Sequence, residues 1–219
     1  MDPTVIELII FDADGVLVDS ETIALAVLAR AASQEGAGIG VEEAIKLFRG
    51  RKMADCVHEI ERRLGRSVSD TFVADLRRAT ASAFDAELKP VEGIHAALAE
   101  IAIPTCVASN GPMSKLTHTL GLTKLLDHFE GRIFSAYEVG SWKPEPGLFL
   151  HAAQTLNVHP SRCIVIEDSL SGAYAAKAAG MQVLGFTGGD PSAEIELRGV
   201  CGKTFHRMSE LPSLLQQTN

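Results

Sequence analysis

Two aspartates separated by a single residue follow the first strongly apolar segment of the chain. Asp12 and Asp14 come directly after residues 8–11, Leu-Ile-Ile-Phe, and Gly15 follows them. A short, continuous apolar run predicts a strand buried on both faces, as in a parallel sheet. Two carboxylates about 4 Å apart repel by about 4 kcal/mol at an effective dielectric constant of about 20, and Mg²⁺ relieves that repulsion. Loop or capping aspartates would have the same spacing, so the remaining motifs must decide.

Polar groups suited to phosphate and metal binding also follow two later apolar segments. Ser109 and Asn110 follow one of these segments directly, and Glu167 and Asp168 follow the other. The carboxyl ends of parallel strands lie along one edge of a sheet, where open α/β folds bind ligands. Lys143 stands alone in a Trp-Lys-Pro loop just before a predicted helix. Four carboxylates and one lysine at such an edge form an unstable cluster unless a cation and an anion complete it. Mg²⁺ and a phosphate would do so.

The elements that carry these residues predict an α/β fold with an inserted helical domain. From residue 90 onward, strands alternate with helices, which predicts a doubly wound, mainly parallel sheet and a Rossmann-like core. Between the first two strands the apolar spacing is helical throughout. We therefore expect a Rossmann-like core of residues 1–18 and 89–219 and an all-helical domain of residues 19–88 that is inserted like a cap.

The expected cap helices are residues 22–33, 41–48, 53–64 and 69–88. The expected core strands are residues 8–11, 105–108, 133–135, 163–166 and 182–186, and the core helices are residues 93–101, 115–120, 146–156 and 171–179.

Composition limits the class of protein and its partners. The chain has 219 residues, 46% of them hydrophobic, and a formal net charge of −8, which predicts a packed core and argues against nucleic-acid or acidic-lipid partners. Its four scattered cysteines lack a C-x-x-C pair, so reduced thiols are expected. With no signal-peptide pattern and no apolar stretch of about 18 residues, we expect a cytoplasmic protein without a membrane partner. A monomer or weak homodimer is expected.

Four segments together resemble the haloacid dehalogenase superfamily, in its phosphatase branch with a helical cap, the beta-phosphoglucomutase-like branch. The resemblance covers essentially the whole chain, with the segments in the family's order. The segments are D-A-D-G-V-L-V-D-S at residues 12–20, V-A-S-N-G at 107–111, W-K-P-E-P at 142–146 and I-E-D-S-L-S-G-A-Y-A-A-K-A-A-G-M at 166–181. Each segment alone is less informative than the four in combination.

The resemblance implies that two aspartates perform the chemistry. Asp12 would attack phosphorus and form an aspartyl-phosphate, which divides the reaction into two steps. Asp14 would protonate the leaving oxygen and then take a proton from the hydrolytic water. It would also give its backbone carbonyl to Mg²⁺, beside the Asp12 carboxylate.

The same resemblance implies the remaining ligands of metal and phosphate. Asp168 would bind the metal directly, and Glu167 directly or through water. Ser109, Asn110 and Lys143 would hold the transferring phosphoryl group. Positioning and charge neutralisation of this kind dominate catalysis of phosphoryl transfer.

Substrate selection is expected from the cap, whose basic run Arg49-Gly50-Arg51-Lys52 lies where related caps meet the substrate. We expect Arg51 and Lys52 to bind an anionic leaving group, although such a run can equally be a solvated helix start. The resemblance implies a phosphatase acting on a small sugar or sugar-acid phosphate of the 6-phosphogluconate kind, with phosphoglycolate as the alternative.

Three other functions remain as alternatives. A sugar phosphomutase of the same branch is disfavoured, because Ala24 stands where those mutases carry a histidine. A phosphoacceptor signalling module would not need a leaving-group acid such as Asp14. A binding protein that has lost catalysis is disfavoured by the intact acidic motifs.

Overall fold

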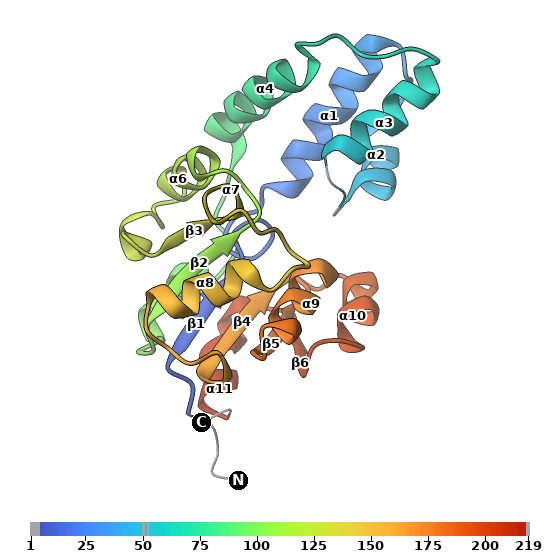
Figure 1. Ribbon diagram of the computed structural model, residues 1–219. Coiled ribbons are helices and arrows are strands. Elements are labelled where there is room, and N and C mark those ends of the chain that lie inside the picture. The colour runs from blue at the N-terminus through green and yellow to red at the C-terminus, as the bar shows by residue number, and fades with distance from the viewer. Residues whose placement is uncertain (1–4, 50, 52, 218–219) are drawn as a thin grey trace. The chain divides into compact units, whose positions relative to one another are not determined.

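The computed structural model describes residues 5–49, 51 and 53–217. The chain divides into two compact units: residues Asp19–Lys89, and the two remaining segments, which end at Val18 and begin at Pro90 (Figure 1). The second boundary lies one residue later than the sequence analysis drew it. Within the described part of the chain, no helix has the length and apolar character needed to cross a membrane.

The larger unit contains the sheet. Its strands are β1 (Leu8–Phe11), β2 (Thr105–Ser109), β3 (Ile133–Ser135), β4 (Cys163–Glu167), β5 (Gln182–Phe186) and β6 (Lys203–Phe205). Its helices are α5 (Ile94–Glu100), α6 (Met113–Leu122), α7 (Ala136–Val139), α8 (Gly147–Thr155), α9 (Leu170–Ala178), α10 (Pro191–Arg198) and α11 (Leu211–Gln216), with short 3₁₀ turns η1 (Asp127–Phe129), η2 (Pro160–Arg162) and η3 (Met208–Glu210).

All neighbouring strands of the six-stranded sheet are parallel, and their order is β3-β2-β1-β4-β5-β6. The predicted doubly wound α/β fold is confirmed. The order reverses at β1, which pairs with β2 on one side and with β4 on the other. In such sheets the crevice beyond the carboxyl ends of the strands at the reversal is the usual ligand site. Asp12, directly after β1, lies at that point.

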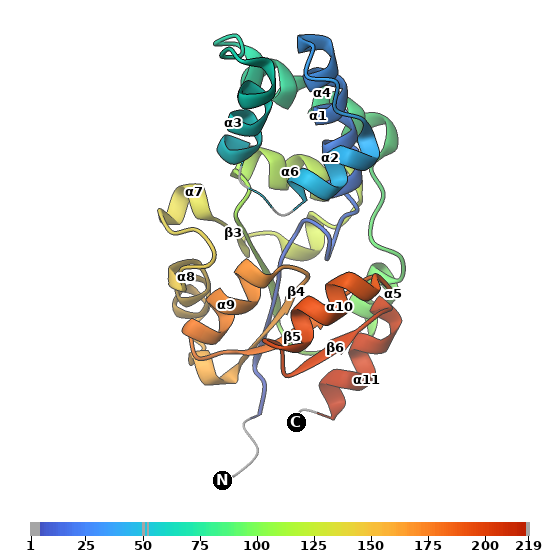
Figure 2. The same ribbon diagram turned by 90° about the vertical axis from the view of Figure 1, so that its right-hand side faces the viewer.

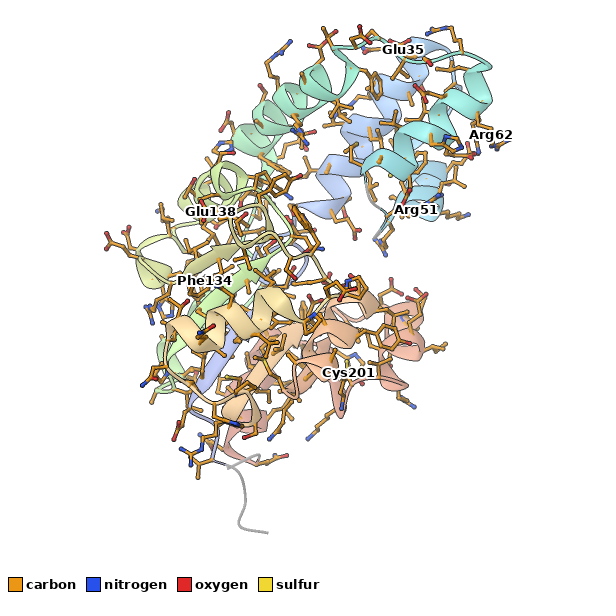
Figure 3. The ribbon with its side chains drawn as sticks, in the orientation of Figure 1. Glu35, Arg51, Arg62, Phe134, Glu138 and Cys201 are labelled. Atoms are coloured by element: carbon orange, nitrogen blue, oxygen red, sulfur yellow. The ribbon has the colours of Figure 1, made fainter. Side chains whose placement is uncertain are left out.

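The central strand is buried on both faces because its side chains alternate between two helical layers. Leu8 and Ile10 join the core beneath α8 and α9, while the Phe11 ring packs edge-on against Phe129 at 6.1 Å. Figure 2 shows α8 and α9 on one side of the sheet and α5 and α11 on the other. Phe134 and Cys201, labelled in Figure 3, belong to the first of these core layers.

The C-terminal part of the sheet was missed by the sequence analysis. Strand β6 was not predicted, nor were α10 and α11. β6 has three residues and lies at the edge of the sheet, and its first residue, Lys203, is exposed. A three-residue segment with Phe205 as its one apolar residue gives no strand periodicity.

The smaller unit is all-helical, with α1 (Glu21–Glu35), α2 (Val41–Phe48), α3 (Met53–Leu64) and α4 (Phe72–Glu87). Each lies within three residues of its predicted bounds. Its own core includes Leu28 of α1, Phe48 of α2, Ile60 of α3 and Leu76 of α4. Gly36 ends α1 with a φ of 101°, a left-handed conformation that glycine adopts without strain.

Gly172 in the first turn of α9 should be intolerant of any side chain. A Cβ at Gly172 would lie 1.7 Å from Oε1 of Glu167, whose carboxylate is fully buried. We expect Gly172→Ala to lower the free energy of unfolding by about 1–3 kcal/mol, the usual cost of overpacking. Denaturant unfolding measures this change.

Gly121 of α6 is the matched control, because a Cβ there would meet nothing closer than 3.9 Å. Gly121→Ala should be neutral or stabilise by up to about 1 kcal/mol, since alanine favours a helix interior. Equal unfolding free energies for the two variants would contradict the close approach of α9 to Glu167.

Candidate active site

A buried lysine joins the ends of β1 and β4. Nζ of Lys143 donates to Oδ1 of Asp12 at 2.5 Å and to Oε1 of Glu167 at 2.6 Å. Lys143 is 3% exposed and Glu167 0%. The ammonium also lies 4.9 Å from the centre of the Phe149 ring. These contacts fix one positive charge beside the carboxylate predicted to be the nucleophile.

Burial and neighbouring charge oppose each other in this cluster. Burial, together with the charges of Glu167 and Asp14, raises the pKa of Asp12 to about 7 against the lowering effect of Lys143. For Lys143, burial acts to lower the pKa, but Asp12 and Glu167 outweigh it through charge and hydrogen bonds, so its pKa is raised. Lys143 is therefore a permanent cation at neutral pH.

Both carboxylate oxygens of Glu167 are engaged within the protein. Oε1 accepts from Lys143, and Oε2 accepts from the backbone N–H groups of Asp168 and Ser169 at 3.0 and 2.9 Å and from the Ser169 hydroxyl at 2.8 Å. Oγ of Ser169 also accepts from the N–H of Gly172, at the start of α9. In this arrangement Glu167 orients Lys143.

The side chain of Asn110 holds the backbone of the loop that carries Lys143. Its Oδ1 accepts from the Lys143 N–H at 2.9 Å, and its Nδ2 donates to the Lys143 carbonyl at 3.4 Å. The sequence analysis assigned Asn110 to the phosphoryl group, and the structure gives its amide this additional role. The adjoining Lys143–Pro144 peptide bond is cis.

Ser109 is the last residue of β2. The residue is 2% exposed, and its Oγ accepts from the N–H of Gly111 at 3.2 Å. Ser135 Oγ donates to the carbonyl of Gly111 at 2.7 Å, which ties this turn to the end of β3. The turn is therefore fixed by contacts from two neighbouring strands.

Asp14 has a cationic partner that the sequence analysis missed. Nζ of Lys115 donates to Oδ2 of Asp14 at 2.6 Å, and each side chain is 31% exposed. Lys115 lies in the first turn of α6. A lysine at the positive end of a helix is unfavourable for the helix dipole, and this local conflict was the signal available in the sequence.

The donor chemistry of the site fits a Mg²⁺ ion. Fully ionised, Asp12, Asp14, Glu167 and Asp168 would exceed the two nearby lysines by two negative charges. The carboxylate of Asp168 lies close against Gly15, where a Cβ would be 1.9 Å from Oδ2.

Within the described part of the chain, no three His, Cys, Asp or Glu residues are arranged to hold a metal ion. Mg²⁺ commonly uses only one or two carboxylates and retains several waters. The carboxylate oxygens of this edge are donors of the kind that Mg²⁺ prefers.

Arg51, one of the two basic residues predicted to bind substrate, belongs to the smaller unit. It is exposed, lies just beyond α2 (Figure 3), and donates from Nη1 to the Leu47 carbonyl at 3.3 Å. Arg49 forms an ion pair with Glu21 at 3.2 Å. Lys52 lies outside the described residues. The roles of Arg51 and Lys52 stay predictions.

Comparison with known proteins identifies relatives over nearly the full chain. The family model described as haloacid dehalogenase-like hydrolase matches residues 6–180. The 6-phosphogluconate phosphatase of Escherichia coli (strain K12) is 37% identical over 210 residues, which cover 95% of this chain and 94% of that protein.

Two solved structures resemble the whole chain. A haloacid dehalogenase-like protein of unknown function from Agrobacterium tumefaciens is 34% identical, with a TM-score of 0.87 and coverage of 97% of this chain and 98% of that one. A haloacid dehalogenase family hydrolase from Deinococcus radiodurans, with bound phosphate and sodium, is 27% identical with a TM-score of 0.81, covering 98% and 97% of the two chains. The chain therefore belongs to the haloacid dehalogenase-like hydrolases, the family that its four motifs predicted.

Proposed function

We propose that the protein is a Mg²⁺-dependent phosphatase that hydrolyses a small phosphorylated sugar or sugar acid through an aspartyl-phosphate on Asp12. The observation that carries the proposal is the buried contact of Lys143 with Asp12 and Glu167, beyond the strand at which the sheet order reverses. A fixed cation beside a carboxylate suits the stabilisation of a phosphoryl group in transfer.

The first step joins Asp12 to phosphorus. A carboxylate oxygen of Asp12 forms the new P–O bond as the bond to the leaving alcohol breaks, and Asp14 gives its proton to the departing oxygen. In the second step, water attacks the aspartyl-phosphate, Asp14 takes a proton from that water, and Asp12 is released. Lys143 and the Ser109 hydroxyl would hold the equatorial phosphoryl oxygens through both steps.

The metal would be held by the carboxylates of Asp12 and Asp168 and by the backbone carbonyl of Asp14. Because both Glu167 oxygens have protein partners, we propose that Glu167 reaches the metal through water. Mg²⁺ would neutralise charge on the phosphoryl oxygens and on the attacking carboxylate.

The curated relatives support the proposed substrate class. The 6-phosphogluconate phosphatase of E. coli is 37% identical over almost the whole chain, which supports a sugar-acid phosphate. We propose that the helical unit selects this substrate, with Arg51 and Lys52 binding the anionic part of the leaving group. Phosphoglycolate and a phosphomutase reaction remain the alternatives to be tested.

Replacing the nucleophile should abolish turnover. We expect Asp12→Asn to lower kcat/KM by about 10⁴-fold or more on any substrate hydrolysed by the wild-type protein, because no carboxylate remains to attack phosphorus. Phosphate release from a panel of sugar phosphates, sugar-acid phosphates and phosphoglycolate provides the measurement.

Asp127→Asn is the matched control, since Asp127 is an exposed residue in η1, and it should keep wild-type activity. Full activity of Asp12→Asn would refute the nucleophile. If a sugar phosphate were isomerised in a bisphosphate-dependent reaction instead of hydrolysed, the mutase alternative would be correct.

Chelation of divalent cations should stop the reaction. We expect no phosphate release after dialysis against EDTA and full recovery on addition of Mg²⁺. Asp168→Asn should raise the Mg²⁺ concentration for half-maximal rate by about 10-fold or more, because a charged ligand is lost. Undiminished activity in EDTA would exclude the metal from the mechanism.

Asn110→Ala tests whether this amide serves mainly to position Lys143. We expect kcat/KM to fall by about 10²-fold, as small displacements of a catalytic group do. Because two hydrogen bonds to the Lys143 backbone are lost, the free energy of unfolding should also fall by about 1–2 kcal/mol.

Ser114→Ala, at an exposed position in α6, is the control and should change neither quantity. A loss of activity in Asn110→Ala with unchanged stability would assign Asn110 to direct phosphate binding alone.

A further inference from the structure

The side chain of Lys115 contacts Asp14, although the two residues are 101 positions apart in the sequence. Its aliphatic stem runs over the turn that follows β2, where a Cβ on Gly111 would lie 3.7 Å from Cδ of Lys115 and 3.6 Å from Oγ of Ser109. The backbone N–H of Lys115 donates to the Pro112 carbonyl at 2.9 Å. Both ends of the Lys115 side chain are thus held in place. Its stem lies on the turn at Gly111, and its ammonium contacts Asp14.

Neither helix formation nor overall stability accounts for a lysine at this position. A cation in the first turn of α6 opposes the helix dipole. An ion pair in which each side chain is 31% exposed contributes little to folding, because solvent screens it. The contact instead links two residues of the reaction site, the turn carrying Ser109 and the carboxylate of Asp14.

We propose that Lys115 is a positioning residue for protonation of the leaving group. Its ammonium holds the Asp14 carboxyl group at the place where the departing oxygen must receive a proton. When Asp14 has transferred that proton and the P–O bond has broken, the same ammonium lies beside the newly formed carboxylate and stabilises it. This inference rests on the proposed function, in which Asp14 is the acid.

The chemistry of the leaving group separates this role from substrate binding and from folding. The alkoxide of a sugar is a poor leaving group and requires a proton, whereas 4-nitrophenolate departs readily as an anion. A defect in positioning Asp14 must therefore lower kcat/KM, which covers only the steps up to departure of the leaving group, much more for a sugar phosphate than for 4-nitrophenyl phosphate. A defect in folding or in phosphate binding slows both substrates alike.

The test compares Lys115→Met, Lys115→Arg and the control Lys177→Met on 4-nitrophenyl phosphate and on the best sugar phosphate of the panel. Lys177 is an exposed lysine of α9. We expect Lys115→Met to lower kcat/KM on the sugar phosphate by about 10²-fold, the lower end of a general-acid contribution, and kcat/KM on 4-nitrophenyl phosphate by less than about 3-fold. Lys115→Arg should restore most of the loss, and Lys177→Met should match the wild type.

A second variant tests whether Lys115 affects the rate through Asp14. Asp14→Asn should show the same selective loss in kcat/KM, and adding Lys115→Met to it should lower kcat/KM little further, because both changes affect the same protonation of the leaving group. Equal loss on the two substrates, no loss, or full additivity with Asp14→Asn would overturn the proposal for Lys115 while leaving the phosphatase assignment intact. Hydrolysis of neither substrate by the wild-type protein would overturn both.

Discussion

The buried ammonium of Lys143 is the interaction on which the rest of the site depends. Removing an ammonium and two carboxylates from water costs several kcal/mol per ion, and the cost is offset only when geometry and hydrogen bonding are nearly complete. Here Asp12 and Glu167 contact the ammonium, and Ser169 and the backbone after β4 satisfy the far oxygen of Glu167. Loss of any one member would leave another buried charge without a full set of partners.

The sheet topology explains how such a cluster forms from distant parts of the chain. β1 pairs with β2 and β4, so the residues after three strands meet at one edge. The loop carrying Lys143 has no strand of its own at this point, and the Asn110 side chain holds it against the end of β2. Backbone pairing therefore positions the acids, and a side-chain contact positions the lysine.

Much of this arrangement could be predicted because short apolar strands followed by polar residues are local patterns. Asp12 follows β1, while Ser109 and Glu167 are the last residues of β2 and β4. The structure brings Lys143 to Asp12 and Glu167. The predicted direct roles in phosphate and metal binding remain predictions.

What the sequence analysis missed depends on contacts between distant residues. The partner of Asp14 is Lys115, and the Asn110 side chain is engaged by the Lys143 backbone. No periodicity encodes such pairings, because each depends on where two segments distant in sequence meet in three dimensions. β6 was missed for a different reason, since a three-residue edge strand has too little pattern to detect.

The central position of β1 has a consequence for biosynthesis. β1 is synthesised well before its partner β4, which begins at Cys163, so the apolar segment Leu8–Phe11 lacks one neighbour until β4 has left the ribosome. Such long-range parallel pairing slows folding and leaves hydrophobic strand edges open to other chains in the interval. The helical segment Asp19–Lys89, by contrast, has its own core and is complete well before β4 is synthesised. Nascent chains of this protein should thus carry a folded helical unit before β1 has paired with β4.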